Sequence, residues 1–463
     1  MSTLTVRSAP REDADRAARR RTGLRFAGIA GGNFMVALDA TILNVALPDM
    51  RAGLHAPAAA LPWAVDAYTV VLAGLMLASG SIADRWGPRR VYRAALAGFA
   101  VFSLLCALAP NAGVLIAGRA LLGVPAAGLV PASMALLVAL YPEPAVRSRK
   151  IGALVSISGL GIVAGPVLGG ALVAAGGWRL VFLVNVPVAL LTLLGSRGLS
   201  THRGGTAKPI DLTGLLLSIA GLTVLTFGLV DAGTGGWLRP RPAVALVIAA
   251  VAIALLPLAQ RRAAAPVLPP SLMSLTRVRM DLVVAVMSQL IYYGLLFTLT
   301  QWMVNERGMS ALQAGLAFLP MTVPVAFIPM LTGRLVVRFG SRPVMLAGMT
   351  LDLLGGLLLA TGDTSSLWIA FAVQILVGAG SPLAIPACIA DMSTAVPLEL
   401  AATGQGALNA ARQTGTALGV AIFGTLAALS STGLVLAAGA AATVAIVGLA
   451  GRRVRLVRRV PSA

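Results

Sequence analysis

The sequence predicts an all-α protein that crosses a membrane many times. Hydrophobic residues make up 58% of its 463 residues and charged residues only 11%, less than half of the roughly 25% that is usual in soluble domains. Its mean hydropathy is +0.89. The 51 glycines and 27 prolines are spread through the apolar runs, as is common in transmembrane helices. This composition excludes a water-soluble globular domain.

A window of about 20 apolar residues, the length that crosses a bilayer, predicts fourteen transmembrane helices. An even number places both chain ends on the same side of the membrane. The predicted helices have these limits: 24–47, 63–82, 91–109, 113–140, 149–174, 179–195, 211–231, 243–259, 280–304, 311–332, 343–361, 366–390, 402–427 and 430–450.

The basic residues predict which side that is. Of the 36 Lys and Arg residues, 29 lie in the tails and loops on the side shared by the termini, and five lie on the opposite side. Because short cytoplasmic loops carry an excess of Lys and Arg, both termini are expected in the cytoplasm. The net charge of +20 does not point to a nucleic-acid partner, since the cations are not interleaved with base-stacking aromatic residues.

The sequence repeats itself at a nearly constant offset. The stretch 80-GSIADRWGPRRV-91 returns as 333-GRLVVRFGSRPV-344, and two further helices match at almost the same spacing. Chance similarity between glycine-rich helices is the alternative, but it does not explain three ordered matches. We therefore expect two homologous six-helix halves, 24–195 and 278–450, joined by a linker at 196–277 that holds two inserted helices, with cytoplasmic tails at 1–23 and 451–463.

Four motifs carry a resemblance to a known family. They are 38-LDATILNVALP-48, 80-GSIADRWGPRR-90, 161-GIVAGPVLGG-170 and 178-WRLVFLVNVP-187. They resemble the major facilitator superfamily, and within it the fourteen-helix drug:proton antiporters of the multidrug and quaternary-cation efflux branch. The similarity covers almost the whole chain and includes 405-QGALNAARQTGTALGVAIFG-424. It implies a major facilitator fold with 6+2+6 helices, alternating access, and export of amphipathic, cationic compounds in exchange for protons.

The loop after the second helix is the predicted gate. Gly80 would let the second and eleventh helices approach closely, and Asp84 would accept hydrogen bonds at a helix end. The resemblance implies that the motif stabilises the outward-facing state, through Gly80, Asp84, Arg85, Gly87 and Arg89. The second copy has Val337 where the first has Asp84. The alternative role, fixing topology alone, fits Arg90.

The predicted fifth helix carries five small or helix-bending residues, Gly161, Gly165, Pro166, Gly169 and Gly170. Small residues four apart allow tight helix crossing, and a proline removes a backbone hydrogen bond and permits a bend. We expect these residues to serve helix packing and gating and to take no part in substrate chemistry.

Ionisable groups inside a span are functional candidates, because inserting one costs about 2.5–3.5 kcal/mol. Asp39 is the first candidate for proton coupling, since a low-dielectric environment disfavours the charged carboxylate. Arg119 is its expected cationic neighbour, at a position that the resemblance links to proton transfer. A static ion pair between helices is the alternative for both residues.

Asp66 is the candidate for substrate recognition. The resemblance implies that an acid here recognises cations, and Trp63 and Tyr68 could add their ring faces. A residue at the wetted outer interface is the alternative. The other candidates are Asn44, Tyr293 and Gln301 as substrate-binding residues, and Asp281, Asp352 and Arg412 as further membrane charges, with a simple pairing to Arg277 as the alternative for Asp281.

Enzyme signatures are absent from the sequence. No GxxxxGK[ST] motif is present, so ATP is not expected as the energy source, and His55 and His202 fall in opposite loops, where they predict neither a metal site nor a nucleophile triad. We expect no cofactor, with H⁺ as the coupling ion, and a monomer in the inner (plasma) membrane whose partners are amphipathic small molecules and lipid. The alternatives are a dedicated exporter of an endogenous metabolite or self-made antibiotic, and a non-transporting membrane sensor.

Overall fold

The protein is described here by a computed structural model. It describes residues 9–55, 61–199, 211–235, 239–261, 263, 266, 268–309, 313, 316–362, 366–423 and 438–444. Within these ranges all regular secondary structure is helical. The predicted tail 451–463 and most of the predicted helix 430–450 lie outside the described residues.

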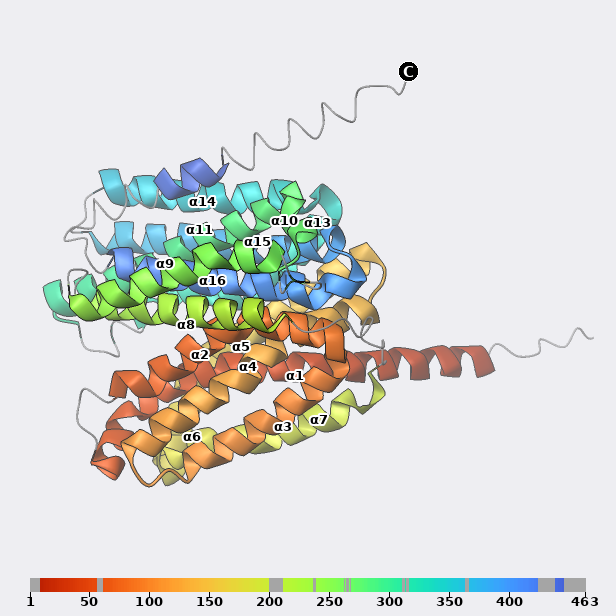
Figure 1. The fold of residues 1–463 in the computed structure, drawn as a ribbon, viewed down its shortest axis with the longest axis horizontal. Helices are drawn as coiled ribbons and strands as arrows, with labels where there is room; N and C mark the ends of the chain where they lie inside the picture. The colour runs from red at the N-terminus through yellow and green to blue at the C-terminus, as the bar shows by residue number, and fades with distance from the viewer. Residues whose placement is uncertain are drawn as a thin grey trace, which may run out of the picture.

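The N-terminal helices form one bundle, coloured red to yellow in Figure 1. They are α1 (Ala9–Leu54), α2 (Leu61–Trp86), α3 (Pro88–Ala107), α4 (Ala112–Leu140), α5 (Pro144–Gly176), α6 (Arg179–Leu183) and α7 (Asn185–Gly195), followed by the 3₁₀ turn η2 (Ser196–Gly198). Helix α1 begins at Ala9, inside the segment predicted as a tail, and Figure 1 shows it projecting from the bundle. The predicted sixth span, 179–195, consists of α6 and α7 together.

The C-terminal helices form a second bundle, green to blue in Figure 1. They are α10 (Pro270–Ser274), α11 (Thr276–Gln301), which continues into the π-helical turn η3 (Trp302–Glu306), α13 (Leu319–Phe339), α14 (Ser341–Thr361), α15 (Leu367–Ala395), the 3₁₀ turn η4 (Leu398–Leu400) and α16 (Ala401–Phe423).

The inserted pair is α8 (Leu212–Gly235) and α9 (Pro240–Arg261), drawn in green. Helix α8 packs against α2 of the first bundle and against α16 of the second. Trp63 of α2 stacks on Phe227 of α8, with ring centroids 5.5 Å apart. The insertion therefore lies along the boundary between the two bundles.

Most of the helices are long and apolar enough to cross a membrane. The described residues contain 11 such spans. The number rises to 12 if the two parts of α5, which meet at a 44° bend after Gly165, are taken together as one further span. Helix α16 is not among them, and it carries Gln405, Asn409 and Arg412 in its sequence. The coarse prediction of a many-helix membrane protein is confirmed.

Two glycines make the same turn in each bundle. Gly87 links α2 to α3 with φ of 89°, and Gly340 links α13 to α14 with φ of 85°. A side chain at such positive φ would clash with the backbone, so glycine is the residue that fits. Their separation is the offset at which the loop motif repeats in the sequence.

Candidate proton-coupling and gating sites

Asp39 and Arg119 form an ion pair inside the first bundle. Nη1 of Arg119 in α4 lies 2.6 Å from Oδ2 of Asp39 in α1, and each side chain is 1% exposed. Nε of Arg119 donates to the Ala64 carbonyl at 2.8 Å, and its guanidinium lies 4.4 Å from the Tyr68 ring centroid. The two charged residues predicted for proton coupling, Asp39 and Arg119, therefore lie together in one buried cluster.

Asn185 is a further member of this cluster, which the sequence analysis did not single out. Its Nδ2 donates to Oδ1 of Asp39 at 3.0 Å and lies 3.3 Å from the Ser103 hydroxyl of α3. Each Asp39 oxygen therefore has its own donor. Asn185 begins α7 within the quoted motif 178-WRLVFLVNVP-187, and a lone amide in that apolar run was the available signal.

The predicted substrate residues whose side chains the structure describes, Trp63, Tyr68 and Tyr293, do not converge on one pocket. The ring of Tyr68 is covered by Arg119, whereas Trp63, five positions earlier on α2, faces α8. Tyr293 packs edge to face with Tyr292 at 5.4 Å in α11. The side chains of Asn44, Asp66 and Gln301 lie outside the described residues.

Asp84 joins the two bundles at one end of the molecule. Its carboxylate accepts the backbone N–H groups of Ala402 at 2.9 Å and Thr403 at 2.6 Å, at the start of α16. Free N–H groups and the helix dipole make a helix N-terminus a favourable site for a carboxylate. Nearby, Nη1 of Arg147 in α5 donates to the Ser393 carbonyl of α15 at 2.9 Å.

Gly80 lies against the same helix start, where a Cβ atom would clash with the Ala402 carbonyl. The neighbour of α2 here is α16, the thirteenth predicted helix and not the eleventh that we expected, because the inserted pair shifts the helix order by two. The second bundle repeats the contact: a Cβ at Gly333 of α13 would lie 2.6 Å from the Ser148 carbonyl of α5.

The other loop-motif residues also lie at this end. Nη2 of Arg89 donates to the Arg197 carbonyl in η2 at 2.8 Å, and Gly87 makes the positive-φ turn. Arg85 is half-buried in the last turn of α2, where it interacts with another group. Because several of the predicted basic loops gather here, we call it the basic-loop end.

The glycines of α5 pack against α1. A Cβ at Gly161 would lie 2.8 Å from the Phe34 carbonyl, one at Gly169 would lie 2.7 Å from the Ile42 carbonyl, and one at Gly165 would collide with Thr41. Gly170 is half-buried, and the side chain of Pro166 lies outside the described residues. Helix α16 makes an equivalent contact with α11, where a Cβ at Gly419 would lie 2.5 Å from the Leu290 carbonyl.

The second bundle holds further charges. Arg277 of α11 does not bond to Asp281, one turn along the same helix, but to Asp391 of α15, from Nε at 3.1 Å and Nη2 at 2.5 Å. Asp352 of α14 is 0% exposed, and neither of its oxygens accepts a hydrogen bond within the described residues. Arg412 donates to Oδ1 of Asn409 at 3.1 Å on α16.

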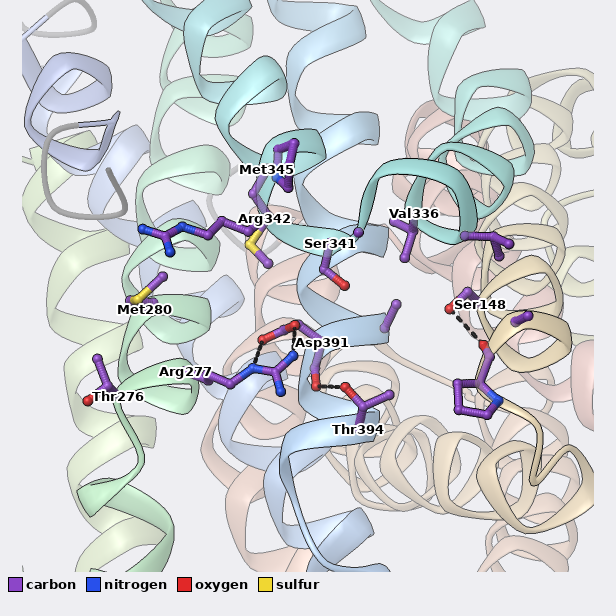
Figure 2. A pocket seen from close by; sticks show the side chains of 16 residues that line it. Ser148, Thr276, Arg277, Met280, Val336, Ser341, Arg342, Met345, Asp391 and Thr394 are labelled. Atoms are coloured by element: carbon purple, nitrogen blue, oxygen red, sulfur yellow. Dashed lines mark hydrogen bonds and ion pairs between the residues drawn. The ribbon is translucent and has the colours of Figure 1, made fainter. Parts of the chain in front are cut away.

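Described residues form a pocket in each half of the molecule. The first, of about 530 Å³, opens at the basic-loop end between the start of α5 and helices α11, α13, α14 and α15, and Figure 2 shows Arg277 and Asp391 facing each other in it. The second, of similar volume, is almost wholly apolar and lies between α2, α3 and α4 beside Ile219 of α8. Trp63, Tyr68 and Tyr293 line neither.

Comparison with known proteins places this architecture. The family model described as Major Facilitator Superfamily matches residues 29–256 and 282–462. The chain belongs to the major facilitator superfamily. It is 34% identical over 404 residues to the multidrug resistance protein Stp of Mycobacterium tuberculosis, covering 87% of this chain and 75% of Stp. It is also 34% identical over 435 residues to the puromycin resistance protein of Streptomyces alboniger, covering 92% and 85% of the two chains.

A solved structure agrees with this assignment at the level of the fold. The human organic anion transporter MFSD10 superposes with a TM-score of 0.69 at 16% identity, over 93% of this chain and 99% of that one. The superfamily consists of membrane transporters with many apolar helices. The family match and the resistance-protein relatives confirm the resemblance that the four motifs indicated. Transport, and not catalysis of a chemical reaction, is the activity typical of such a protein.

Proposed function

We propose that this chain is a proton-coupled exporter of amphipathic, cationic compounds that works by alternating access. The observation that carries the proposal is the buried cluster of Asp39, Arg119 and Asn185. A charged carboxyl deep in a membrane protein is expensive unless it is paired, so its protonation is linked to whether Arg119 stays beside it. Export is supported by relatives whose names mark them as multidrug and antibiotic resistance proteins.

The closed basic-loop end supports the assignment of a conformation. Asp84 and Arg147 tie the two bundles together there, and Gly80 and Gly333 allow backbone contact. If this end faces the cytoplasm, as the positive-inside rule predicts for both termini, the conformation is the outward-facing one. We also propose that the chain crosses the membrane fourteen times and that this membrane is the plasma membrane.

The cycle follows from these positions. In the outward-facing form Asp39 takes up a proton, its attraction to Arg119 falls, and the substrate leaves. The bundles then rock about their boundary, which breaks the contacts at the basic-loop end. The proton is released to the cytoplasm, and the next substrate binds, with Asp66 as the acid that would recognise a positive charge.

A second candidate function is the export of one dedicated compound. The puromycin resistance relative, whose name mentions a single antibiotic, favours this candidate. Uptake of structurally unrelated compounds into vesicles separates the two, since a dedicated exporter would respond to one chemical class only.

The test uses purified protein in sealed vesicles with an acidic interior and a dilute fluorescent lipophilic cation outside. The wild type should accumulate the dye against its gradient until a protonophore is added. Asp39→Asn should lose this uphill uptake. The control is Asp49→Asn. Asp49 lies on α1 outside the cluster, where its carboxylate accepts the backbone N–H of Trp178 at 2.8 Å, so this variant should keep uphill uptake.

A folding defect must be separated from a coupling defect. The two cysteines, Cys106 and Cys388, are free and buried, so a thiol-reactive dye reports unfolding without added labels. Full uphill uptake by folded Asp39→Asn, or a wild type that ignores the pH gradient, would contradict the proposal.

A further inference from the structure

The second bundle holds two buried carboxyl groups beside one guanidinium. Arg277, whose side chain is largely exposed, uses Nε and Nη2, two of its three guanidinium nitrogens, to bind the two oxygens of Asp391. Asp281 is 1% exposed, and within the described residues neither of its oxygens accepts a hydrogen bond. This acid is therefore buried and unpartnered beside a completed ion pair.

The surrounding charges do not neutralise Asp281. Its helix α11 contributes Arg277, and the facing helix α15 contributes Asp391, and these are the two charges that act on it. Arg412 of α16 bonds to Asn409 on its own helix, and Arg342 of α14 lines the pocket nearby. With one cation shared by two carboxyl groups, a charged Asp281 would be a buried, uncompensated anion, which is strongly disfavoured.

The cluster has a route to water. Arg277 and Asp391 line the pocket of about 530 Å³ at the basic-loop end, together with Met280, the residue before Asp281 (Figure 2). The opposite wall includes Pro144 and Ser148 of α5, which belongs to the other bundle. Because the wall is shared between the bundles, any motion of one bundle against the other changes this pocket.

We propose that Asp281 is a second proton-carrying acid, neutral in this conformation because Arg277 is committed to Asp391, and that it releases its proton into this pocket when Arg277 changes partner. The inference rests on the proposed proton coupling and adds a site in the second bundle. Arg277 and Asp281 are four residues apart on α11, the spacing at which helical side chains meet. As Arg277 turns to Asp281, the O–H bond of Asp281 breaks and its proton passes to pocket water, while Asp391, which lines the pocket, stays charged and is solvated by that water in place of Arg277.

Infrared difference spectra of purified protein test the proton itself, without transport. Asp281→Asn should remove one protonated-carboxyl band at neutral pH, whereas a band from Asp352, which is also buried with neither oxygen hydrogen-bonded within the described residues, should stay. Asp391→Asn should remove the same band, because Arg277 is then free to pair with Asp281 and hold it charged. Asp49→Asn should leave the band in place. A spectrum that loses no band in Asp281→Asn overturns the site, and one that loses no band in Asp391→Asn overturns the partner exchange; the thiol dye confirms that each variant is folded.

The vesicle assay separates this inference from the proposed function. Asp281→Asn should still accumulate dye in response to the pH gradient, with about one proton fewer moved per substrate, because Asp39 remains. A wild type that does not respond to the gradient contradicts the proposed function. A responsive wild type whose proton count equals that of Asp281→Asn contradicts this inference alone.

Discussion

Asp84 and Thr403 are 319 residues apart in the sequence, yet the Asp84 carboxylate accepts the Thr403 backbone N–H at 2.6 Å. The bond links the last turn of α2 to the first turn of α16, and therefore one bundle to the other. A second bond, from the Ala402 N–H at 2.9 Å, completes the cap. The stability of the closed basic-loop end should depend on this carboxylate.

Asp84→Ala should shift the protein toward opening at the basic-loop end. Hydrogen bonds to a charged group contribute about 1.5–3 kcal/mol, so the ratio of closed to open protein should fall by about tenfold or more. Spin labels at the exposed residues Arg90 and Leu398 would report the change as a longer distance. An unchanged distance distribution would show that the cap does not hold the gate.

Val337→Asp, the matching change in the second bundle, should not tighten that side. At the repeat offset of 254 residues, Arg147 is equivalent to Ala401, the first residue of α16. Helix α5 begins three residues earlier, at Pro144, so the N–H groups that follow Arg147 already lie inside the helix and are bonded there. A new carboxylate finds no free donors there. Spin labels at the exposed residues Glu143 and Arg338 should give the wild-type distance, and a shift to a shorter one would be inconsistent with this reasoning.

Gly161→Ala should destabilise the contact between α1 and α5. The new Cβ would lie 2.8 Å from the Phe34 carbonyl, and overpacking of this kind costs about 1–3 kcal/mol. The control is Gly23→Ala, where no atom lies within 4 Å of the new Cβ and helix propensity improves by about 1 kcal/mol. Unfolding titrations in mixed micelles should move in opposite directions for the two variants.

Tyr68→Phe should leave stability unchanged or raise it slightly. The Tyr68 hydroxyl is buried without a hydrogen-bond partner within the described residues, whereas the ring lies under Arg119. Tyr68→Leu should lower the free energy of unfolding by about 2 kcal/mol, because the cation–π contact is lost in a desolvated site. Equal effects of both variants in the same titration would argue against the ring contact.

Arg119→Lys should impair the protein although it keeps the charge. Arg119 binds Asp39 through Nη1 and the Ala64 carbonyl through Nε, and a single ammonium group cannot reproduce this fork. Coupled dye uptake should fall at least about tenfold if one charge-assisted bond is lost. Uptake at the wild-type rate would mean that charge alone is enough.

Local sequence patterns predicted much of this fold. Apolar runs of spanning length gave helices near the predicted places in the described part of the chain, although α13 (Leu319–Phe339) begins later than the predicted helix 311–332. The repeated loop motif was predicted, but the positive-φ turns that it makes at Gly87 and Gly340 were not. The extension of α1 back to Ala9 was not expected, because a polar, Arg-rich segment carries no apolar signal for a span. A polar segment can still be helical, because Ala and Arg have high helix propensity.

Partner choice was less predictable. Asp39 and Arg119 were paired on the strength of a family resemblance, and the structure places them at 2.6 Å. Asn185 was missed because amides in apolar helices have many possible partners. Arg277 lies one turn from Asp281 but binds Asp391, 114 residues away, through Nε and Nη2.

The sequence by itself determined that this chain is helical, belongs in a membrane, gathers its cations in alternate loops and repeats its glycine contacts, because these properties follow from the order of neighbouring residues. The tertiary structure decided that α16 is the neighbour of Gly80, that Asp84 caps that helix, and that Asp281 accepts no hydrogen bond from any described residue. Such contacts depend on which helix faces cross in space, and no local pattern along the chain specifies that geometry.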